Sequence, residues 1–478
     1  MGKEEFVKEI TNIEEDFAKW YTDVVRKAEL ADYTDTKGCI AIKPYGYAIW
    51  ENIQNYADRK FKEVGVENVY FPVLIPESLL QKEKDHVEGF APEVAWVTEA
   101  GNEKLDEKYC IRPTSETMFS TLYSKWLHSW RDLPMVYNQW CNVLRWEKET
   151  RPFLRSREFL WQEGHTIHET QKEAEERTIQ MLDIYADVIE NLLAIPVLKG
   201  RKTEKEQFAG AVATYTVESL MHDGRALQAG TSHYFGQNFT KPFDVKFQNR
   251  EGKEEYAYQT SWGISTRLIG AVIMAHGDNR GLKLPPRVAP TQVVIVPVAM
   301  HKDGVKEKAT ELFNSLNKKF RTKVDLRDNY TPGFKFNDWE MRGVPVRVEI
   351  GPRDIENGVA MLVRRDTLQK ETVELSNLEN RIEELLEEIH ISMFNECLKR
   401  REEKTTIAYS LDEIIKNLEE NQGYVKTMWC EDVACEEKIK EVTGAHSRCI
   451  PFEQEHISDT CPVCGKKASK MVVWGRQY

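Results

Sequence analysis

One segment of this chain is rich in both charged and aromatic residues: residues 145–165, which read RWEKETRPFLRSREFLWQEGH. Arg145-Trp146-Glu147 is strand-like, a loop with several arginines follows it, and an aromatic strand comes next. Guanidinium groups bind phosphate oxygens bidentately, and a carboxylate can accept a hydrogen bond from an exocyclic amine. The segment therefore suits ATP, although Arg-x-Glu on a strand, taken alone, is usually a surface ion pair.

Two further stretches concentrate polar groups in the same way: residues 112–116 (RPTSE) and residues 261–267 (SWGISTR). Between residues 135 and 292, aromatic-rich, strand-like segments alternate with a long predicted helix near residues 170–194. This pattern is typical of an antiparallel sheet flanked by helices. We therefore expect an α+β fold in which a large catalytic-type domain occupies residues 1–285.

A proline-rich segment, residues 284–290 (LPPRVAP), predicts a domain boundary, because three prolines in seven residues cannot extend a helix. The elements predicted after it indicate an α/β domain at 286–375, and an amphipathic helix then leads into a tail at 376–478. The predicted order is strand, helix, strand, helix, strand, strand, at residues 293–298, 302–320, 323–327, 334–342, 344–350 and 358–364.

The composition excludes several classes of protein. Of 478 residues, 41% are hydrophobic and 30% are charged, so the chain can bury more than one core and is neither collagen-like nor disulfide-stapled. The formal net charge of −12 excludes a broadly basic nucleic-acid coat. The first residues lack the apolar core of a signal peptide, and the apolar runs are too short to span a membrane. With nine cysteines, the chain is expected in a reducing, cytoplasmic compartment.

Four cysteines of the tail have metal-ligand spacing. Cys430 and Cys435 are separated by four residues, and Cys461 and Cys464 form a C-x2-C knuckle. Two such pairs in one short segment predict a structural, tetrahedral zinc site with four thiolate ligands. Buried free cysteines are the plain alternative, and His446 or Cys449 could replace one ligand.

Together these segments resemble the prolyl-tRNA synthetase family of class II aminoacyl-tRNA synthetases. The resemblance covers essentially the whole chain, and its cysteine tail and final Tyr478 resemble the archaeal and eukaryotic-like form. Fewer than 100 residues separate Glu163 from Ser261, so the large editing insertion of the common bacterial form is not expected. The matching residues are 112–116, 145–147, 159–165, 230–233, 261–263, 276–279, 286–287 and, in a stretch similar to the family's anticodon-binding domain, 340–354.

The resemblance implies a class II antiparallel catalytic sheet flanked by helices, an α/β anticodon-binding domain and a small zinc-binding α+β tail. It also implies a site for ATP with Mg²⁺. Arg145 and Arg267 are the implied catalytic residues, because Arg145 would contact the α-phosphate and Arg267 would lie on the base and reach the phosphates. The implied ATP-binding residues are Arg145, Glu147 (adenine amine), Arg155 (outer phosphates), Phe159 (base stacking), Gln228, Thr231, Ser265 and Arg267.

A pocket for L-proline is implied beside the ATP site. Its first two residues would accept the N–H donors of the secondary ammonium group, and the others would form or support a ring-sized wall. A histidine is ordinarily a satisfied core residue, but both pocket histidines stand inside matching motifs. Such a wall discriminates weakly against a smaller side chain, at about 1–3 kcal/mol per methylene, so mischarging with alanine is expected. The implied residues are Thr114, Glu116, Arg145, Trp161, Glu163, His165, Phe208 and His233.

The implied partner is tRNA(Pro). Glu340, Arg347 and Arg353 could read guanine edges of the anticodon, and the reading of these residues as solvated charges has similar weight. A predicted helix at 46–61 followed by a predicted strand at 69–76 resembles the first class II motif, which builds a homodimer interface. The same elements could equally form an ordinary domain core.

The function implied is that of a proline–tRNA ligase, which activates L-proline with ATP and transfers it to tRNA. Two rivals remain at this point. One is a synthetase-like paralogue that acts as a binding or regulatory module without charging activity, against which the complete set of ATP residues argues. The other is a sibling ligase for threonine, glycine or histidine; a threonine enzyme would place a catalytic zinc in the pocket, and the matching motifs hold no Cys/His set for one.

Overall fold

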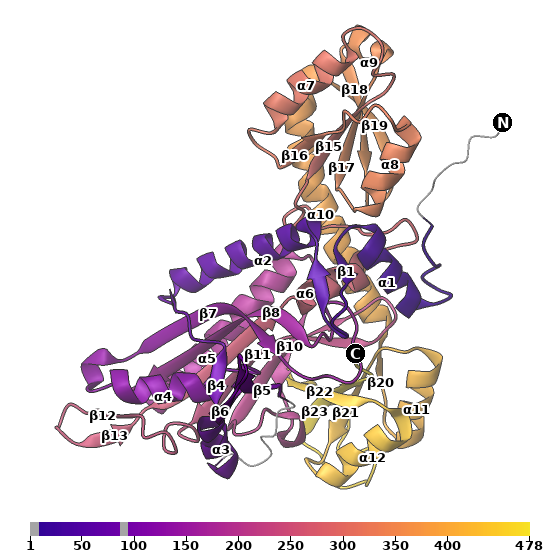
Figure 1. Ribbon diagram of the computed structural model, residues 1–478. Helices are drawn as coiled ribbons and strands as arrows, with labels where there is room; N and C mark the ends of the chain where they lie inside the picture. Colours follow the sequence, from indigo (N-terminus) through magenta and orange to yellow (C-terminus); the bar gives the residue numbers. More distant parts are fainter. Residues whose placement is uncertain (1–8, 87–93) are drawn as a thin grey trace.

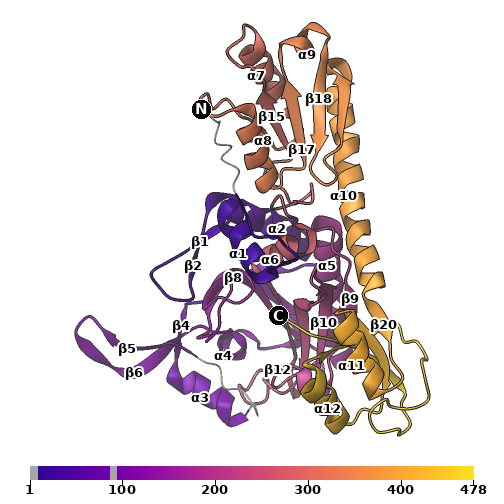
Figure 2. The ribbon, with the colours of Figure 1, turned by 90° about the vertical axis from the view of Figure 1, so that its right-hand side faces the viewer.

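The computed structural model describes residues 9–86 and 94–478, so the first eight residues of the expected catalytic domain lie outside it. A sheet of eleven strands fills one half of the molecule, and a separate five-stranded sheet stands at the opposite end (Figure 1). One long helix, α10 (Leu378–Glu403), runs from the five-stranded sheet down to the tail (Figure 2). Within the described ranges, no helix is both long and apolar enough to cross a membrane.

The centre of the large sheet is antiparallel, as expected. Strand β8 (Glu158–His168) lies between β7 (Met135–Leu144) and β14 (Tyr258–Ser265), and β11 (Ala226–Gly236) pairs with the other edge of β14. Helix α5 (Gln171–Asp187) covers one face, where Tyr185 donates a hydrogen bond to Gln162 at 2.8 Å. Because side chains alternate along a strand, residues 161, 163 and 165 point to the other face.

Helix α5 begins where the sequence predicted it. The side chain of Thr170 accepts a hydrogen bond from the backbone N–H of Glu173, and the Glu173 carboxylate accepts one from the N–H of Thr170. After Asp187 the helix continues as one π turn, Val188–Leu192. The other helices of this part are α1 (Phe17–Lys27), α2 (Pro44–Glu63), α3 (Glu77–His86), α4 (Glu116–Trp126) and α6 (Arg267–His276).

The strand expected at residues 69–76 is wrong as a continuous element. Pro72 has no N–H to donate, and the chain forms only two short strands, one before and one after this point, in different sheets. The strands of this part not yet named are β1 (Ala31–Tyr33), β2 (Ile40–Ile42), β3 (Glu67–Asn68), β4 (Leu74–Pro76), β5 (Trp96–Ala100), β6 (Glu103–Ile111), β9 (Leu198–Arg201), β10 (Ala213–Leu220), β12 (Lys246–Gln248) and β13 (Glu254–Tyr256).

The five-stranded sheet has the order β16-β15-β17-β18-β19, with β15 parallel to β16 and β17 and the remaining pairs antiparallel. Each predicted strand and helix of this region is present; most have shorter ends, whereas β16 and α8 begin one and two residues earlier than predicted. Its apolar core packs against the first half of α10. The elements are β15 (Val293–Pro297), α7 (Val305–Leu316), β16 (Thr322–Val324), α8 (Pro332–Met341), β17 (Val346–Ile350), α9 (Pro352–Glu356), β18 (Val359–Arg364) and β19 (Lys370–Glu374).

The tail does not form a sheet of its own, because its strands extend the large sheet. Strand β22 pairs with β23 on one side and with β9 on the other, where Ile450 lies opposite Arg201. The tail is therefore joined to the part expected to be catalytic by backbone hydrogen bonds. Its elements after α10 are β20 (Thr405–Ile407), α11 (Leu411–Glu420), β21 (Tyr424–Trp429), α12 (Val433–Thr443), β22 (His446–Pro451) and β23 (Lys470–Gly475).

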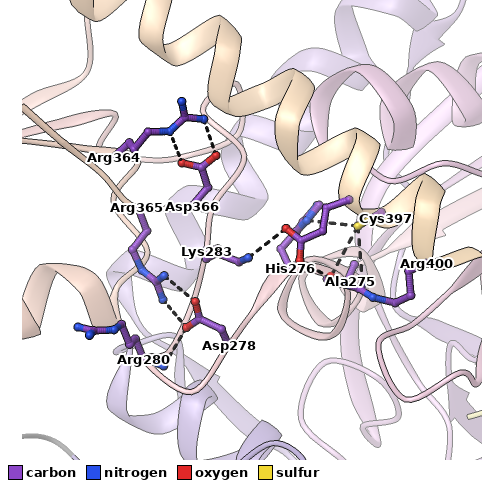
Figure 3. A network of polar contacts seen from close by, with 11 residues as sticks. Ala275, His276, Asp278, Arg280, Lys283, Arg364, Arg365, Asp366, Cys397 and Arg400 are labelled. Atoms are coloured by element: carbon purple, nitrogen blue, oxygen red, sulfur yellow. Dashed lines mark hydrogen bonds and ion pairs between the residues drawn. The ribbon is translucent and has the colours of Figure 1, made fainter. Parts of the chain in front are cut away.

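A polar network joins the segment after α6 to the five-stranded region (Figure 3). Arg365 donates two hydrogen bonds to Asp278, at 2.7 and 2.8 Å. Burial raises the pKa of the Asp278 carboxyl, but the bonds from Arg365 outweigh this effect and lower it. Arg280, from the same segment, pairs with Glu340 of α8 at 2.9 Å. The chain that leaves α6 is thus tied to the region expected to bind the anticodon.

Candidate active site

A cavity of about 240 Å³ lies on the face of the large sheet opposite α5. All the residues implied for ATP or proline line it, except Glu147 and Arg155. Gly164 explains how its floor is built: a Cβ there would lie 2.1 Å from Cζ2 of Trp262, so only glycine lets that indole pack under β8. The lining residues expected from the sequence are Thr114, Glu116, Arg145, Phe159, Trp161, Glu163, His165, Phe208, Gln228, Thr231, His233, Ser265 and Arg267.

Glu163 is the most heavily hydrogen-bonded carboxylate of the cavity. It accepts bonds from His165 Nε2 at 3.0 Å, from Gln139 Nε2 at 2.8 Å, and from both the backbone N–H and the hydroxyl of Ser115. Burial would raise the pKa of this carboxyl, but the donors, His165 first among them, outweigh burial and lower it. Glu163 is therefore an ionised carboxylate that holds the ring of His165 in one orientation.

Two supporting residues of this network were missed by the sequence reasoning. Ser115 belongs to the RPTSE stretch but had no role assigned, and Gln139 lies in no motif. Gln139 stands directly opposite Glu163 in the β7–β8 pairing, which is how it reaches the carboxylate. Only the register of the β7–β8 pairing could have identified Gln139, and that register is set by the tertiary fold.

A neutral, aromatic wall closes one side of the cavity. The rings of Phe208 and His233 have centroids 4.8 Å apart, and Thr214 Oγ1 hydrogen-bonds to His233 Nδ1 at 3.0 Å. Burial, with a smaller contribution from nearby His165, lowers the pKa of His233 to about 3, so the imidazole is neutral at physiological pH. This wall can contact an apolar ring without adding a charge.

Acceptor oxygens line the same part of the cavity. The Thr114 hydroxyl donates to the carboxylate of Glu116, which lies in the first turn of α4, and both side chains are buried. The remaining lone pairs of these oxygens can accept hydrogen bonds from a ligand ammonium group.

Two guanidinium groups dominate the other side of the cavity. Arg145 donates from Nε to the carbonyl of Pro113 at 3.1 Å and lies over Phe159 and Trp161, with its guanidinium carbon 5.6 and 5.3 Å from the ring centroids. Arg267, the first residue of α6, donates to two backbone carbonyls at 3.3 Å. Within residues 9–86 and 94–478, neither guanidinium forms an ion pair.

The two guanidinium charges repel each other. Burial and the nearby charges of Arg145 and Arg155 lower the pKa of Arg267 to about 10, and burial lowers the pKa of Arg145 despite three neighbouring carboxylates. An anionic ligand would relieve this repulsion. The arrangement therefore favours a polyphosphate or a carboxylate between the two arginines.

Glu147 and Arg155 lie outside this cavity, in the loop between β7 and β8. The two side chains face each other at 3.6 Å, and both are partly exposed. Arg155 lines a neighbouring cavity of about 550 Å³, which shares Gln228 and Arg267 with the first one and is bordered by Tyr478. The structure thus places Arg155 beside the two-arginine region, while Glu147 lines neither cavity.

The four tail cysteines come together as predicted. Their sulfur atoms all lie within 4.8 Å of one another, and two of the separations are 3.7 Å (Cys430 to Cys435) and 3.6 Å (Cys464 to Cys430). Zn–S bonds of about 2.3 Å in a tetrahedron require sulfur separations of about 3.8 Å, so the four thiols fit zinc. His446 and Cys449 are not part of this cluster, which removes them as alternative ligands.

Of the three residues expected at the anticodon, the structure brings two together. Glu340 pairs with Arg347 at 2.9 Å, and Arg347 lies over the ring of Phe336 at 4.2 Å. Both line a small surface pocket at the start of β17. Arg353 is exposed on α9, which follows the other end of β17, so it is not part of the same group.

Comparisons with known proteins agree with this architecture. Three family models match: a tRNA synthetase class II core domain (G, H, P, S and T) at residues 96–276, an anticodon binding domain at 292–385, and a prolyl-tRNA synthetase C-terminal domain at 411–478. Similar proteins include the proline–tRNA ligase of Alkaliphilus oremlandii, 62% identical, and proline–tRNA ligase 2 of Bacillus cereus, 61% identical, each over the full length of both chains.

A solved structure is similar over the same extent. It is the prolyl-tRNA synthetase of Cryptosporidium parvum complexed with halofuginone and AMPPNP, with a TM-score of 0.94, 44% sequence identity, and coverage of 100% of this chain and 99% of that one. The two relatives are more than 60% identical to this chain over its full length, and the solved structure has the same fold, so the family can be assigned. The chain belongs to the prolyl-tRNA synthetase family of class II aminoacyl-tRNA synthetases.

Proposed function

We propose that this protein is a proline–tRNA ligase: it joins L-proline to AMP at the expense of ATP, releases pyrophosphate, and transfers proline to the 3′ end of tRNA(Pro). The observation that carries the proposal is one cavity lined by two guanidiniums that have no ion pair among the described residues, by the acceptor oxygens of Thr114 and Glu116, and by a neutral aromatic wall. Phosphates, a secondary ammonium group and an apolar ring can all be bound there at once.

The ATP side of the reaction is assigned to the two arginines. Arg145 is close enough to both Glu116 and Arg267 to interact with their charges, so it would contact both the α-phosphate and the attacking carboxylate of proline. The charge that develops at phosphorus is then opposed by a guanidinium that is already in place. Phe159 would stack on the adenine base, and Arg267 would lie on its other face.

The remaining ATP contacts are proposed on the same side. Gln228, Thr231 and Ser265 present neutral oxygens for the ribose and phosphates, and Arg155 would reach the outer phosphates from the neighbouring cavity. Glu147 would meet the adenine amine only if the β7–β8 loop moves, because it lines neither cavity here. Mg²⁺ binds mainly through substrate phosphates and oxygen ligands, so these neutral oxygens fit an ATP-bound Mg²⁺, which would neutralise phosphate charge.

Proline recognition is assigned to the other side. Thr114 and Glu116 would accept the two N–H donors of the ammonium group, while Trp161, Phe208 and His233 would surround the ring. Glu163 and His165 would hold this wall from behind. No general base is needed, because the carboxylate of proline is itself the nucleophile toward ATP.

The domain roles, assembly and location are part of the same proposal. Residues 1–285 would carry catalysis, 286–375 would bind the anticodon through Glu340 and Arg347, with Arg353 nearby, and 376–478 would bind structural zinc through its four cysteines. A homodimer is supported by the exposed apolar surface around the first motif, where Tyr70 is 74% and Leu74 41% exposed. The cytoplasm is the proposed location, where tRNA charging takes place.

The alternative is a synthetase-like protein that binds ligands without charging tRNA. Proline-dependent exchange of pyrophosphate into ATP, followed by transfer of labelled proline to tRNA(Pro), separates the two. The ligase requires both activities, and it requires that threonine, glycine and histidine do not replace proline. A folded protein that binds ATP and proline but shows no exchange would be the binding module instead.

A further inference from the structure

The loop between β9 and β10, residues 202–212, carries one wall of the cavity, and we call it the wall loop. Glu206, Gln207 and Phe208 line the cavity from it. It contains one short 3-10 turn, Glu204–Glu206, so regular backbone hydrogen bonding determines little of its shape. Other contacts must hold Phe208 against His233.

The tail contacts three residues of the loop, all through α12 and through β22, the strand of the large sheet that pairs with β9 (Figure 1). Thr203 donates from Oγ1 to Glu436 at 2.8 Å, in a buried group that also includes the Ser447 hydroxyl. Two further contacts follow along the loop and are partly exposed: Lys205 forms an ion pair with Glu437, and His446 Nδ1 hydrogen-bonds to Glu206, both at 3.0 Å. None of the tail residues lines the cavity.

The wall loop also contacts its own domain near the wall: Asn238 donates to the carbonyl of Gly210 at 2.9 Å, and the ring of Phe208 lies 5.8 Å from that of Phe235. The backbone N–H of Phe208 donates to Thr214 Oγ1 at 3.0 Å, and the same hydroxyl hydrogen-bonds to His233 Nδ1. The loop therefore links the tail to the wall: the tail holds residues 203–206, and two residues later Phe208 packs on His233.

We propose that the C-terminal tail positions the amino-acid pocket, and that Glu436, Glu437 and His446 are positioning residues for proline binding. This inference rests on the proposed function, since it assigns the wall to the proline ring. The tail thus has a second task besides holding zinc: it fixes the wall loop so that the pocket is formed before proline enters.

The geometry predicts which kinetic constant responds. The ATP-side guanidiniums are held by carbonyls of Pro113, Leu154 and Gln228, none of which belongs to the wall loop. Loosening the loop should weaken ground-state binding of proline and leave the reacting atoms as they are. A rise in KM for proline with little change in kcat is the signature of that loss.

The test uses full-length protein and proline-dependent pyrophosphate exchange. Thr203→Val removes a buried hydrogen bond to a carboxylate and should raise KM for proline about tenfold, while Thr203→Ser should behave as wild type. His446→Ala should raise it about threefold, and His446→Asn, whose amide nitrogen can occupy the place of Nδ1, should restore it. KM for ATP and the bound zinc should not change in any variant.

An exposed ion pair keeps the test informative if a buried variant fails to fold. Lys205→Glu and Glu437→Lys should each raise KM for proline, and the double variant should restore it, because the reversed pair can reform. Glu455→Gln is the matched control: it breaks the Lys426–Glu455 pair of the tail, 2.7 Å long, which does not touch the wall loop.

Two outcomes would overturn the inference. One is an unchanged KM for proline in Thr203→Val and in both single charge reversals. The other is evidence of general loosening: either KM for ATP rises as much as KM for proline, or the double variant does not restore KM for proline. A wild-type protein without proline-dependent exchange would overturn the proposed function together with this inference, so the two failures are distinguishable.

Discussion

Replacing Arg145 by alanine should abolish most of the catalysis and leave the fold intact. Its guanidinium lies over the rings of Phe159 and Trp161, so a phosphate contact there is shielded from water. For unit charges about 4 Å apart at an effective dielectric of about 20, the interaction is about 4 kcal/mol. At about 1.4 kcal/mol per tenfold, its loss predicts a decrease of roughly 10³-fold in the rate of adenylate formation.

The assay is proline-dependent exchange of labelled pyrophosphate into ATP, with stability measured by thermal unfolding without ligands. Because Arg145 and Arg267 repel each other, Arg145→Ala should not lower the unfolding temperature of the ligand-free protein. Arg131→Ala is the matched control: this exposed arginine also lies over an indole, Trp130, at 4.7 Å, but outside the cavity, and it should retain full activity. A folded Arg145→Ala protein with exchange within about threefold of wild type would refute the assignment of the catalytic arginine.

Three further predictions follow from the tail, the pocket and the buried histidines. Metal analysis of purified protein should find about one zinc per chain, and Cys461→Ser should lose it and destabilise the tail; a metal-free tail of full stability would contradict the zinc site. With excess alanine and tRNA(Pro), alanyl-tRNA should accumulate, since a ring-sized wall worth roughly 3–5 kcal/mol discriminates only about 10²- to 10⁴-fold. Enzyme-dependent hydrolysis of preformed alanyl-tRNA would show that an editing site exists. Burial lowers the pKa of His168, His233 and His276 to about 3, well below the ordinary 6.5, so the unfolded chain binds more protons than the folded one below pH 6.5. The free energy of unfolding should therefore fall as the pH falls from 6.5 to 4.5, by up to about 1.4 kcal/mol per pH unit for each histidine. Denaturant titrations at several pH values measure this dependence, and in His276→Gln the free energy of unfolding should change less with pH.

The local sequence pattern alone was enough to predict the strands and helices that bury one face. The helical pattern near residues 170–194 predicted α5, and the apolar run at 293–298 predicted β15. The cysteine spacing predicted the cluster that the fold assembles. These features depend on residues close together in the chain, whose periodicity or spacing is visible without knowing what packs against them. The prediction of a strand at 69–76 was wrong because pairing with a neighbouring strand, which local composition does not reveal, decides where a strand exists.

In the candidate site, too, some residues could be predicted from the sequence and others could not. The motifs named most residues of the cavity, because alternate residues of one strand, such as Trp161, Glu163 and His165, must share a face. The sequence did not reveal the neighbours across the sheet. Gln139 reaches Glu163 through the β7–β8 register, and Glu147 lies away from the cavity because the loop turns it toward Arg155.

The role of the tail is the clearest case of what the sequence left open. His446 stands between two cysteine pairs, and from spacing alone it was a candidate zinc ligand. In the folded chain β22 pairs with β9, which turns His446 toward Glu206 and away from the metal cluster. Sequence by itself determined the family and predicted the cysteine cluster and the residues proposed for the site, since each is written in a short segment. Only the tertiary structure decided which distant segments meet, because packing and strand register between residues more than 200 positions apart leave no local pattern.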